Sequence, residues 1–157
     1  MSVRGDVELL RLVPLFSSVD AAQLQILVFS AERPVIPTGE YVLKKGQSDR
    51  AGFLVLGGHG EAYTGQGISP VAKVERGAFL GELQMVARLP ASLSVVARAD
   101  MQVMKIPHEL FMRVCAEFPE SAGRMLGVLS RKLETSVKDL RTVQRFFEGA
   151  DAKAMRR

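Results

Sequence analysis

The sequence predicts a mainly β fold with helices on both sides of it. Between residues 35 and 106, short apolar or alternating runs are separated by glycine-rich turns, which is typical of closely spaced short strands. Outside this region the apolar residues recur at helical spacing. The order helix, strands, helix disfavours a parallel sheet built from alternating βαβ units. We therefore expect a β-barrel or sandwich, jelly rolls included.

Length and composition indicate one globular domain. The chain has 157 residues, of which 47% are hydrophobic and 24% charged, so disorder is a poor description. No apolar run is long enough to cross a bilayer, and the N-terminus lacks a signal-peptide core. The single cysteine, Cys115, excludes an internal disulfide framework and fits a reducing cytoplasm. We expect a cytoplasmic protein with no membrane contact.

The formal net charge is +4, and a nucleic-acid binder would concentrate this charge on one face or tail. Lysine and arginine are instead scattered, apart from a small group at the C-terminus, Lys153, Arg156 and Arg157. We interpret this group as a solvated tail rather than as a nucleic-acid contact.

Two helices are predicted before residue 35. The first is a short helix within the segment 7–16 and ends near Pro14. The second starts with a capping box, in which Asp20 caps the helix and Gln23 lies three residues later. An apolar pair flanks the box as a hydrophobic staple, Val19 and Leu24. This helix should end before the proline at position 34.

The central region predicts six strands at residues 41–44, 53–56, 60–63, 71–74, 93–97 and 102–106. Turn-forming residues separate them at positions 37–39, 46–49, 57–59 and 65–67. After Ile106 a helix starts at residues 107–109, with proline in its first turn. Its predicted apolar face consists of Leu110, Phe111, Val114 and Cys115.

A second C-terminal helix begins at Pro119 and carries an extended apolar seam. Its leucines and phenylalanine recur every seven residues, at Leu126, Leu133, Leu140 and Phe147, with Leu129, Val137 and Val143 beside them. The seam either folds back on its own domain or forms a homodimer. We favour the homodimer because the seam runs for more than twenty residues past Pro119.

Residues 77–97, GAFLGELQMVARLPASLSVVA, are the most informative stretch. Gly81-Glu82-Leu83 predicts a helix start behind a glycine that lets a ligand approach the backbone. The N–H groups of Glu82, Leu83 and Gln84 would then face an anion. After Pro90 the chain continues as a β-branched strand.

This stretch resembles the phosphate-binding cassette of the cyclic nucleotide-binding domain family. The family cassette reads Phe-Gly-Glu-Leu-Ala, a short loop and Pro-Arg-Ala-Ala-Thr-Val, where this chain has residues 80–84 and 90–95. Residues 12–16, LVPLF, and 37–40, PTGE, also resemble family motifs. The resemblance implies a double-stranded β-helix, a jelly-roll-like β-roll of eight strands, with N-terminal helices and a long C-terminal helix.

The resemblance also implies a division of the chain and a ligand site. The divisions are an N-terminal helical segment (1–34), a β-roll (35–106) with its cassette at 77–97, C-terminal helices (107–148) and a basic tail (149–157), within one domain. The implied ligand-binding residues are Leu80, Gly81, Glu82, Leu83, Ala91 and Ser92. Glu82 would accept a hydrogen bond from the ribose hydroxyl; alternatively, it only stabilises the helix start through the dipole.

The chain departs from the family at a critical position. Ala91 stands where the family has the arginine that pairs with the cyclic phosphate, and Arg88 on the loop is a candidate substitute. Leu93 replaces a usual alanine, and either fills core or narrows the pocket. Thr135 and Ser136 are similar to a Thr-Ser pair that contacts the base in the family's catabolite activator.

The sequence shows no sign of catalysis. Two distant histidines, His59 and His108, and one cysteine do not make a metal site or a cupin motif. No nucleophile–base pair is present, and Cys115 is expected to be a buried small hydrophobe. We expect no catalytic residues, metal or cofactor.

We therefore expect a sensor or regulatory module that is not an enzyme. It would bind cAMP or cGMP weakly and act through an unidentified protein partner or its own dimer. The alternative is a degenerate domain that binds no nucleotide and serves protein assembly. About ten residues follow the long helix, too few for a winged helix-turn-helix, so we do not expect a complete transcription factor.

Overall fold

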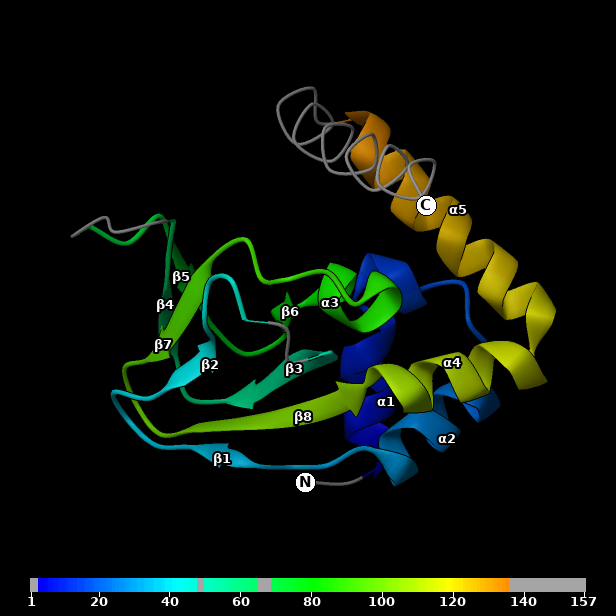
Figure 1. Cartoon of the computed structure of the whole chain (residues 1–157). Helices are drawn as coiled ribbons and strands as arrows, with labels where there is room; N and C mark the ends of the chain where they lie inside the picture. The colour runs from blue at the N-terminus through cyan, green and yellow to red at the C-terminus, as the bar shows by residue number, and fades with distance from the viewer. Residues whose placement is uncertain (1–2, 48–49, 65–68, 136–157) are drawn as a thin grey trace.

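The computed structural model describes residues 3–47, 50–64 and 69–135 (Figure 1). In these ranges a central β region separates two groups of helices, which confirms the predicted fold class. The elements are α1 (Val3–Arg11), the 3-10 helix η1 (Pro14–Phe16), α2 (Ala21–Ser30), β1 (Val35–Ile36), β2 (Tyr41–Leu43), β3 (Ala51–Gly57), β4 (Gly60–Tyr63), β5 (Ala72–Val74), β6 (Phe79–Leu80), α3 (Glu82–Ala87), β7 (Ser94–Ala97), β8 (Met101–Pro107), α4 (His108–Glu117) and α5 (Pro119–Thr135).

The strands form two antiparallel four-stranded sheets. One has the order β1-β8-β3-β6 and the other β2-β7-β4-β5. Strand β3 is buried along almost its whole length because both of its faces are covered. Its side chains alternate, as a strand requires: Phe53 and Val55 join one core cluster, while Leu54 and Leu56 join another.

The two clusters place the core on both sides of the sheet that contains β3. The first core cluster joins the helices to this sheet, and includes Leu10, Phe16, Leu24, Leu54, Met85, Ile106 and Phe111. The second core cluster draws residues from both sheets: Val42, Leu43, Ala51, Phe53, Val55, Ala62, Val74, Ala91, Val95, Ala97, Met101 and Val103. Figure 1 shows α1, α2 and α4 grouped at one end of the roll.

The N-terminal helices differ in detail from the sequence prediction. The first helix starts at Val3 and ends at Arg11, and Pro14 begins a separate 3-10 turn. Asp20 occupies the N-cap position of α2 but makes no side-chain capping bond. The predicted capping box is therefore wrong, because the Gln23 side chain accepts a hydrogen bond from the Ser121 hydroxyl of α5 instead. The predicted staple residues, Val19 and Leu24, are both buried in the first core cluster.

The six predicted strands are present with small shifts of their ends, and two short ones were missed. Strands β1 and β6 contain two residues each, too few to show an alternating pattern. The predicted turn at Pro37 is held from a distant loop, because the Asp100 carboxylate accepts hydrogen bonds from the N–H (3.0 Å) and hydroxyl (2.9 Å) of Thr38. These two bonds lower the pKa of Asp100 below its ordinary value.

The predicted apolar face of α4 is confirmed. Leu110, Phe111 and Val114 are buried, and Cys115 packs against the first core cluster. Burial raises the pKa of the Cys115 thiol, so it remains protonated at neutral pH. Pro107 lies one residue before the helix, at its N-cap position, rather than inside the first turn.

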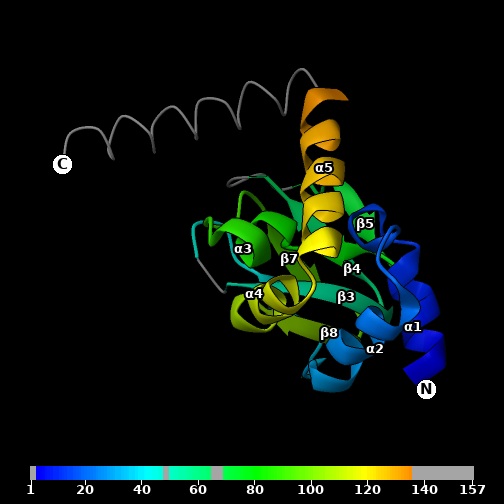
Figure 2. The ribbon, with the colours of Figure 1, turned by 90° about the vertical axis from the view of Figure 1, so that its right-hand side faces the viewer.

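Helix α5 rises away from the roll beyond α4 (Figure 2). Met125 is 2% exposed and Leu129 packs against the first core cluster, so this side of α5 folds back on its own domain. Leu126, the first residue of the predicted seam, is 57% exposed. No described helix combines the length and apolar character needed to cross a membrane.

Several sequence predictions lie outside the described residues. They are the turn at residues 65–67, Ser136, the later seam positions Leu140 and Phe147, and the basic tail at 149–157. The backbone of Leu133 and Thr135 belongs to α5, but their side chains are also outside the description. The proposed division of the chain into segments stays a prediction.

Candidate functional site

The cassette begins on the strand that borders β3. Residues Phe79 and Leu80 form β6, and Leu80 pairs with Phe53 of β3. The chain then turns at Gly81 into α3, a helix of six residues that starts at Glu82. The predicted short helix after the glycine is thus present, and the Met85 N–H donates back to the carbonyl of Gly81 at 2.9 Å.

Gly81 is required for a reason that the sequence did not reveal. Its φ is 77°, a left-handed conformation, and an added Cβ would lie 2.6 Å from the carbonyl oxygen of Ala51. The close approach that we predicted for a ligand is here an approach of Gly81 to the protein's own strand β3. A side chain at this position would push the start of α3 away from the sheet.

Gln84 is a cassette residue whose side chain sequence reasoning did not single out. Its side chain is 6% exposed, and its Nε2 donates a hydrogen bond to the carbonyl oxygen of Pro90 at 3.0 Å. This bond joins α3 to the loop that precedes β7. A long amide at a position where the family has alanine was the available signal, because such a side chain needs a partner when it is buried.

The backbone of Ala91, where we expected the family's arginine, is held by two hydrogen bonds. Its N–H donates to the carbonyl of Gln47 at 3.0 Å, and its carbonyl accepts from the N–H of Gly46 at 2.9 Å. Its side chain is 5% exposed and belongs to the second core cluster. The residue that would meet a phosphate therefore offers a methyl group in an apolar environment.

The remaining predicted site residues differ in their exposure. Leu80 and Leu93 are partly buried and pack against the second core cluster, so Leu93 contributes to the core. Ser92 is exposed. Arg88 is also exposed and, with φ of 58°, adopts a left-handed conformation at the C-cap of α3. Thr135 ends the described part of α5, and no described contact connects it with the cassette.

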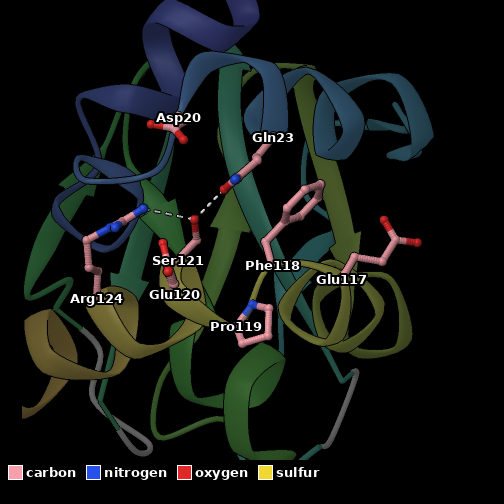
Figure 3. Close-up of a pocket in the computed structure, with 8 residues that line it drawn as sticks. All are labelled: Asp20, Gln23, Glu117, Phe118, Pro119, Glu120, Ser121 and Arg124. Carbon is pink, nitrogen blue, oxygen red and sulfur yellow. Dashed lines mark hydrogen bonds between the residues drawn. The ribbon is translucent and has the colours of Figure 1, made fainter.

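A separate pocket of about 450 Å³ lies where α5 meets the start of α2 (Figure 3). Arg124 donates to the carbonyl of Ser18 and to the Ser121 hydroxyl, both at 3.1 Å, and Ser121 donates to Gln23. The rim includes three carboxylates, Asp20, Glu117 and Glu120. No cassette residue lines this cavity, and its hydrogen bonds fasten α5 to the N-terminal helices.

A charged cluster lies on β4 and just beyond the end of β7, the last strand of the cassette. The Tyr63 hydroxyl donates to Glu61 at 2.6 Å, and Arg98 donates to both residues. The hydrogen bond from Tyr63, followed by that from Arg98, lowers the pKa of Glu61. In the described ranges, no group of three or more His, Cys, Asp or Glu side chains could hold a metal ion.

Comparison with known proteins identifies the family. The family model for the cyclic nucleotide-binding domain matches residues 33–118. A cAMP-dependent protein kinase regulatory subunit of Emericella nidulans is 30% identical over 102 residues, which cover 65% of this chain and 25% of that protein. This chain thus spans about a quarter of that curated relative.

Solved structures agree with this match. A cyclic nucleotide-binding-like protein from Brucella abortus is 30% identical, with a TM-score of 0.66, over 71% of this chain and 98% of the other. The N-terminal domain of a transcriptional regulator from Streptomyces coelicolor is 22% identical, with a TM-score of 0.74, over 81% and 90% of the two chains, and shows the same fold. The chain belongs to the cyclic nucleotide-binding domain family.

Proposed function

We propose that this chain is a regulatory module whose cassette binds a cyclic nucleotide weakly. The observation that carries the proposal is the position of Gly81 and α3: the Gly-Glu-Leu turn is built against β3, with the first turn of α3 following it. N–H groups at a helix start favour an anion such as a cyclic phosphate. The proposed contacts are Leu80, Gly81, Glu82, Leu83, Ala91 and Ser92.

The weakness follows from Ala91. An arginine–phosphate pair is charge-assisted and often bidentate, whereas the Ala91 methyl group lies in an apolar cluster. Such a contact contributes roughly 1.5–3 kcal/mol, so its absence weakens binding about ten- to a hundredfold. Ser92 and the α3 start remain as neutral donors. Arg88 is the candidate substitute cation.

The second candidate function is an assembly module that binds no nucleotide. The burial of Ala91 favours it, because the loop is held by the chain's own hydrogen bonds without a phosphate. Calorimetric titration with cAMP and cGMP, with 5′-AMP as the non-cyclic control, separates the two functions. Binding of a cyclic nucleotide in the micromolar range supports the sensor, and no detectable binding at millimolar concentration supports the assembly module.

Two variants locate the binding. Arg88→Ala should abolish residual binding if Arg88 supplies the countercharge. Glu82→Ala should weaken binding if Glu82 accepts a hydrogen bond from the ribose. Tight binding that survives both changes would place the ligand somewhere other than this cassette.

We also propose that the module acts as a homodimer or on a partner protein. Leu126 exposes 57% of its surface on α5, and the sequence continues its seven-residue spacing to Leu140. Leu126→Glu and Leu140→Glu should each give a monomer in sedimentation experiments. A wild-type protein that is monomeric at high micromolar concentration would exclude the homodimer and leave only the proposal that the module acts on a partner protein.

A further inference from the structure

His108 connects three separate parts of the chain at the start of α4. Its residue surface is 8% exposed, so it is a buried polar group that needs partners. Its backbone N–H donates to the carbonyl oxygen of Arg50 at 2.7 Å, and its ring Nδ1 is hydrogen-bonded to the carbonyl oxygen of Met85. Because a carbonyl oxygen only accepts, Nδ1 carries the proton in this contact.

The Met85 carbonyl belongs to the last turn of α3 and lacks a helical partner. The residue four positions later is Leu89, and its N–H donates to Leu83 instead, at 3.4 Å. The carbonyls of the last turn of a helix need partners from outside it, and a histidine side chain can supply one. The His108 ring thus caps the C-terminal end of the cassette helix from the neighbouring helix α4.

Helix α3 is also hydrogen-bonded to the Gly81 turn at its N-terminal end. The Met85 N–H donates to the carbonyl of Gly81 at 2.9 Å, and the Met85 side chain is fully buried. Met85 therefore receives the His108 ring on one side and contacts the glycine turn on the other.

The backbone contact of His108 fixes the surface against which this turn packs. Arg50 has φ of 52°, an uncommon conformation for a residue with a side chain, and it precedes Ala51. The Ala51 carbonyl is the group that the bare Cα of Gly81 approaches. One residue consequently holds both the end of α3 and the strand start beside Gly81.

We infer that His108 is a positioning residue for the phosphate-binding cassette, acting through Met85 and Arg50 without touching the ligand. The positioning itself is a property of the ligand-free protein. Only its consequence for nucleotide affinity rests on the proposed function.

Three substitutions test the inference. Asparagine places its amide nitrogen where Nδ1 lies, whereas the amide of glutamine lies one methylene further out, and leucine fills the space without a donor. All three keep the backbone N–H that bonds Arg50. His108→Asn should therefore behave like the wild type, while His108→Gln and His108→Leu should release the end of α3.

Amide hydrogen exchange of the ligand-free variants measures this release. In His108→Gln and His108→Leu, exchange in residues 82–89 should accelerate at least tenfold, while α2 and the β3–β8 pair stay within threefold of the wild type. His108→Asn should stay within threefold throughout. If His108→Leu does not fold, the asparagine and glutamine pair decides the question. Equal exchange in these two variants, whether slow or fast, would overturn the inference.

Nucleotide titration separates this result from the proposed function. In an Ala91→Arg background, His108→Gln should lower cyclic nucleotide affinity at least fivefold relative to His108→Asn. If neither His108 variant binds nucleotide in the Ala91→Arg background, the proposed function fails, and the exchange experiment still decides the role of His108. If His108→Asn and His108→Gln differ in amide exchange but bind the cyclic nucleotide with identical, measurable affinities, His108 positions α3 only. That outcome would overturn its proposed effect on nucleotide affinity.

Discussion

Replacing Ala91 with arginine should strengthen cyclic nucleotide binding and, without ligand, destabilise the protein. The backbone of Ala91 is fixed on both sides, by Gln47 at 3.0 Å and Gly46 at 2.9 Å, so the loop is already in place for a new side chain. A bond from the guanidinium to the phosphate contributes roughly 1.5–3 kcal/mol. At about 1.4 kcal/mol per tenfold, Ala91→Arg should tighten binding about ten- to a hundredfold.

The cost in the ligand-free protein follows from burial. Ala91 is 5% exposed among apolar side chains, and an unpaired polar group in such a place costs on the order of 1–3 kcal/mol, with a larger cost for a charged group. Ligand at a hundred times its Kd would return about 2.7 kcal/mol. Ala91→Arg should therefore melt below the wild type without ligand and regain most of the difference with it.

Calorimetry with cAMP and cGMP, combined with thermal melts at several ligand concentrations, measures both effects. Ala91→Met is the matched control, because it fills the same space without a charge and should gain no affinity. Ala91→Lys adds a charge without the bidentate geometry and should gain less than arginine. A folded Ala91→Arg variant that binds no tighter than Ala91→Met would refute the reasoning.

Three further outcomes are expected. Gly81→Ala should lower the free energy of unfolding by more than about 2 kcal/mol, because the new Cβ would lie 2.6 Å from the Ala51 carbonyl oxygen in a left-handed conformation. Urea unfolding measures this loss, and a loss below about 0.5 kcal/mol would contradict the prediction. Arg124→Ala should lower the free energy of unfolding by about 1–2 kcal/mol and accelerate amide hydrogen exchange in α5, because two hydrogen bonds are lost. Unchanged exchange would show that these bonds are not needed to hold α5 in place. The pKa of Asp100 is lowered in the folded state, so the stability that its carboxylate contributes is present above the unfolded pKa and is lost as pH falls through the folded pKa. In Asp100→Asn, the free energy of unfolding should therefore depend less steeply on pH than in the wild type at pH values below 3.8, the ordinary pKa of an aspartate. Equal pH dependence in the two proteins would contradict this.

The fold class could be predicted from the sequence because apolar residues recur at helical spacing outside residues 35–106 and form short apolar or alternating runs within them. In strand β3, residues 53–56 are apolar at successive positions between Gly52 and Gly57, and the strand is covered on both faces. The two-residue strands β1 and β6 could not be predicted, because a pair of residues has no period. Their existence depends on the neighbours with which they pair.

Long-range hydrogen bonds explain the details that sequence reasoning missed. The Gln23 side chain had a plausible local partner in the capping box, and the hydroxyl of Ser121, 98 residues away, takes it instead. The role of His108 is similar, since nothing near it in sequence marks it as the cap of another helix. Sequence rules for helix caps consider only hydrogen-bond partners a few residues away, whereas the fold brings distant residues such as these into hydrogen-bonding distance.

The conformation of the cassette loop is supported by the chain's own hydrogen bonds. Three hydrogen bonds hold the loop internally: Gln84 to Pro90, Ala91 to Gln47 and Gly46 to Ala91. At about 0.5–1.5 kcal/mol each, they contribute roughly 1.5–4.5 kcal/mol together, which matches or exceeds a single arginine–phosphate contact of about 1.5–3 kcal/mol. The chain can therefore order this loop in the absence of phosphate. We therefore expect the charges at positions 88 and 91, rather than the shape of the loop, to decide whether a cyclic nucleotide binds at this cassette.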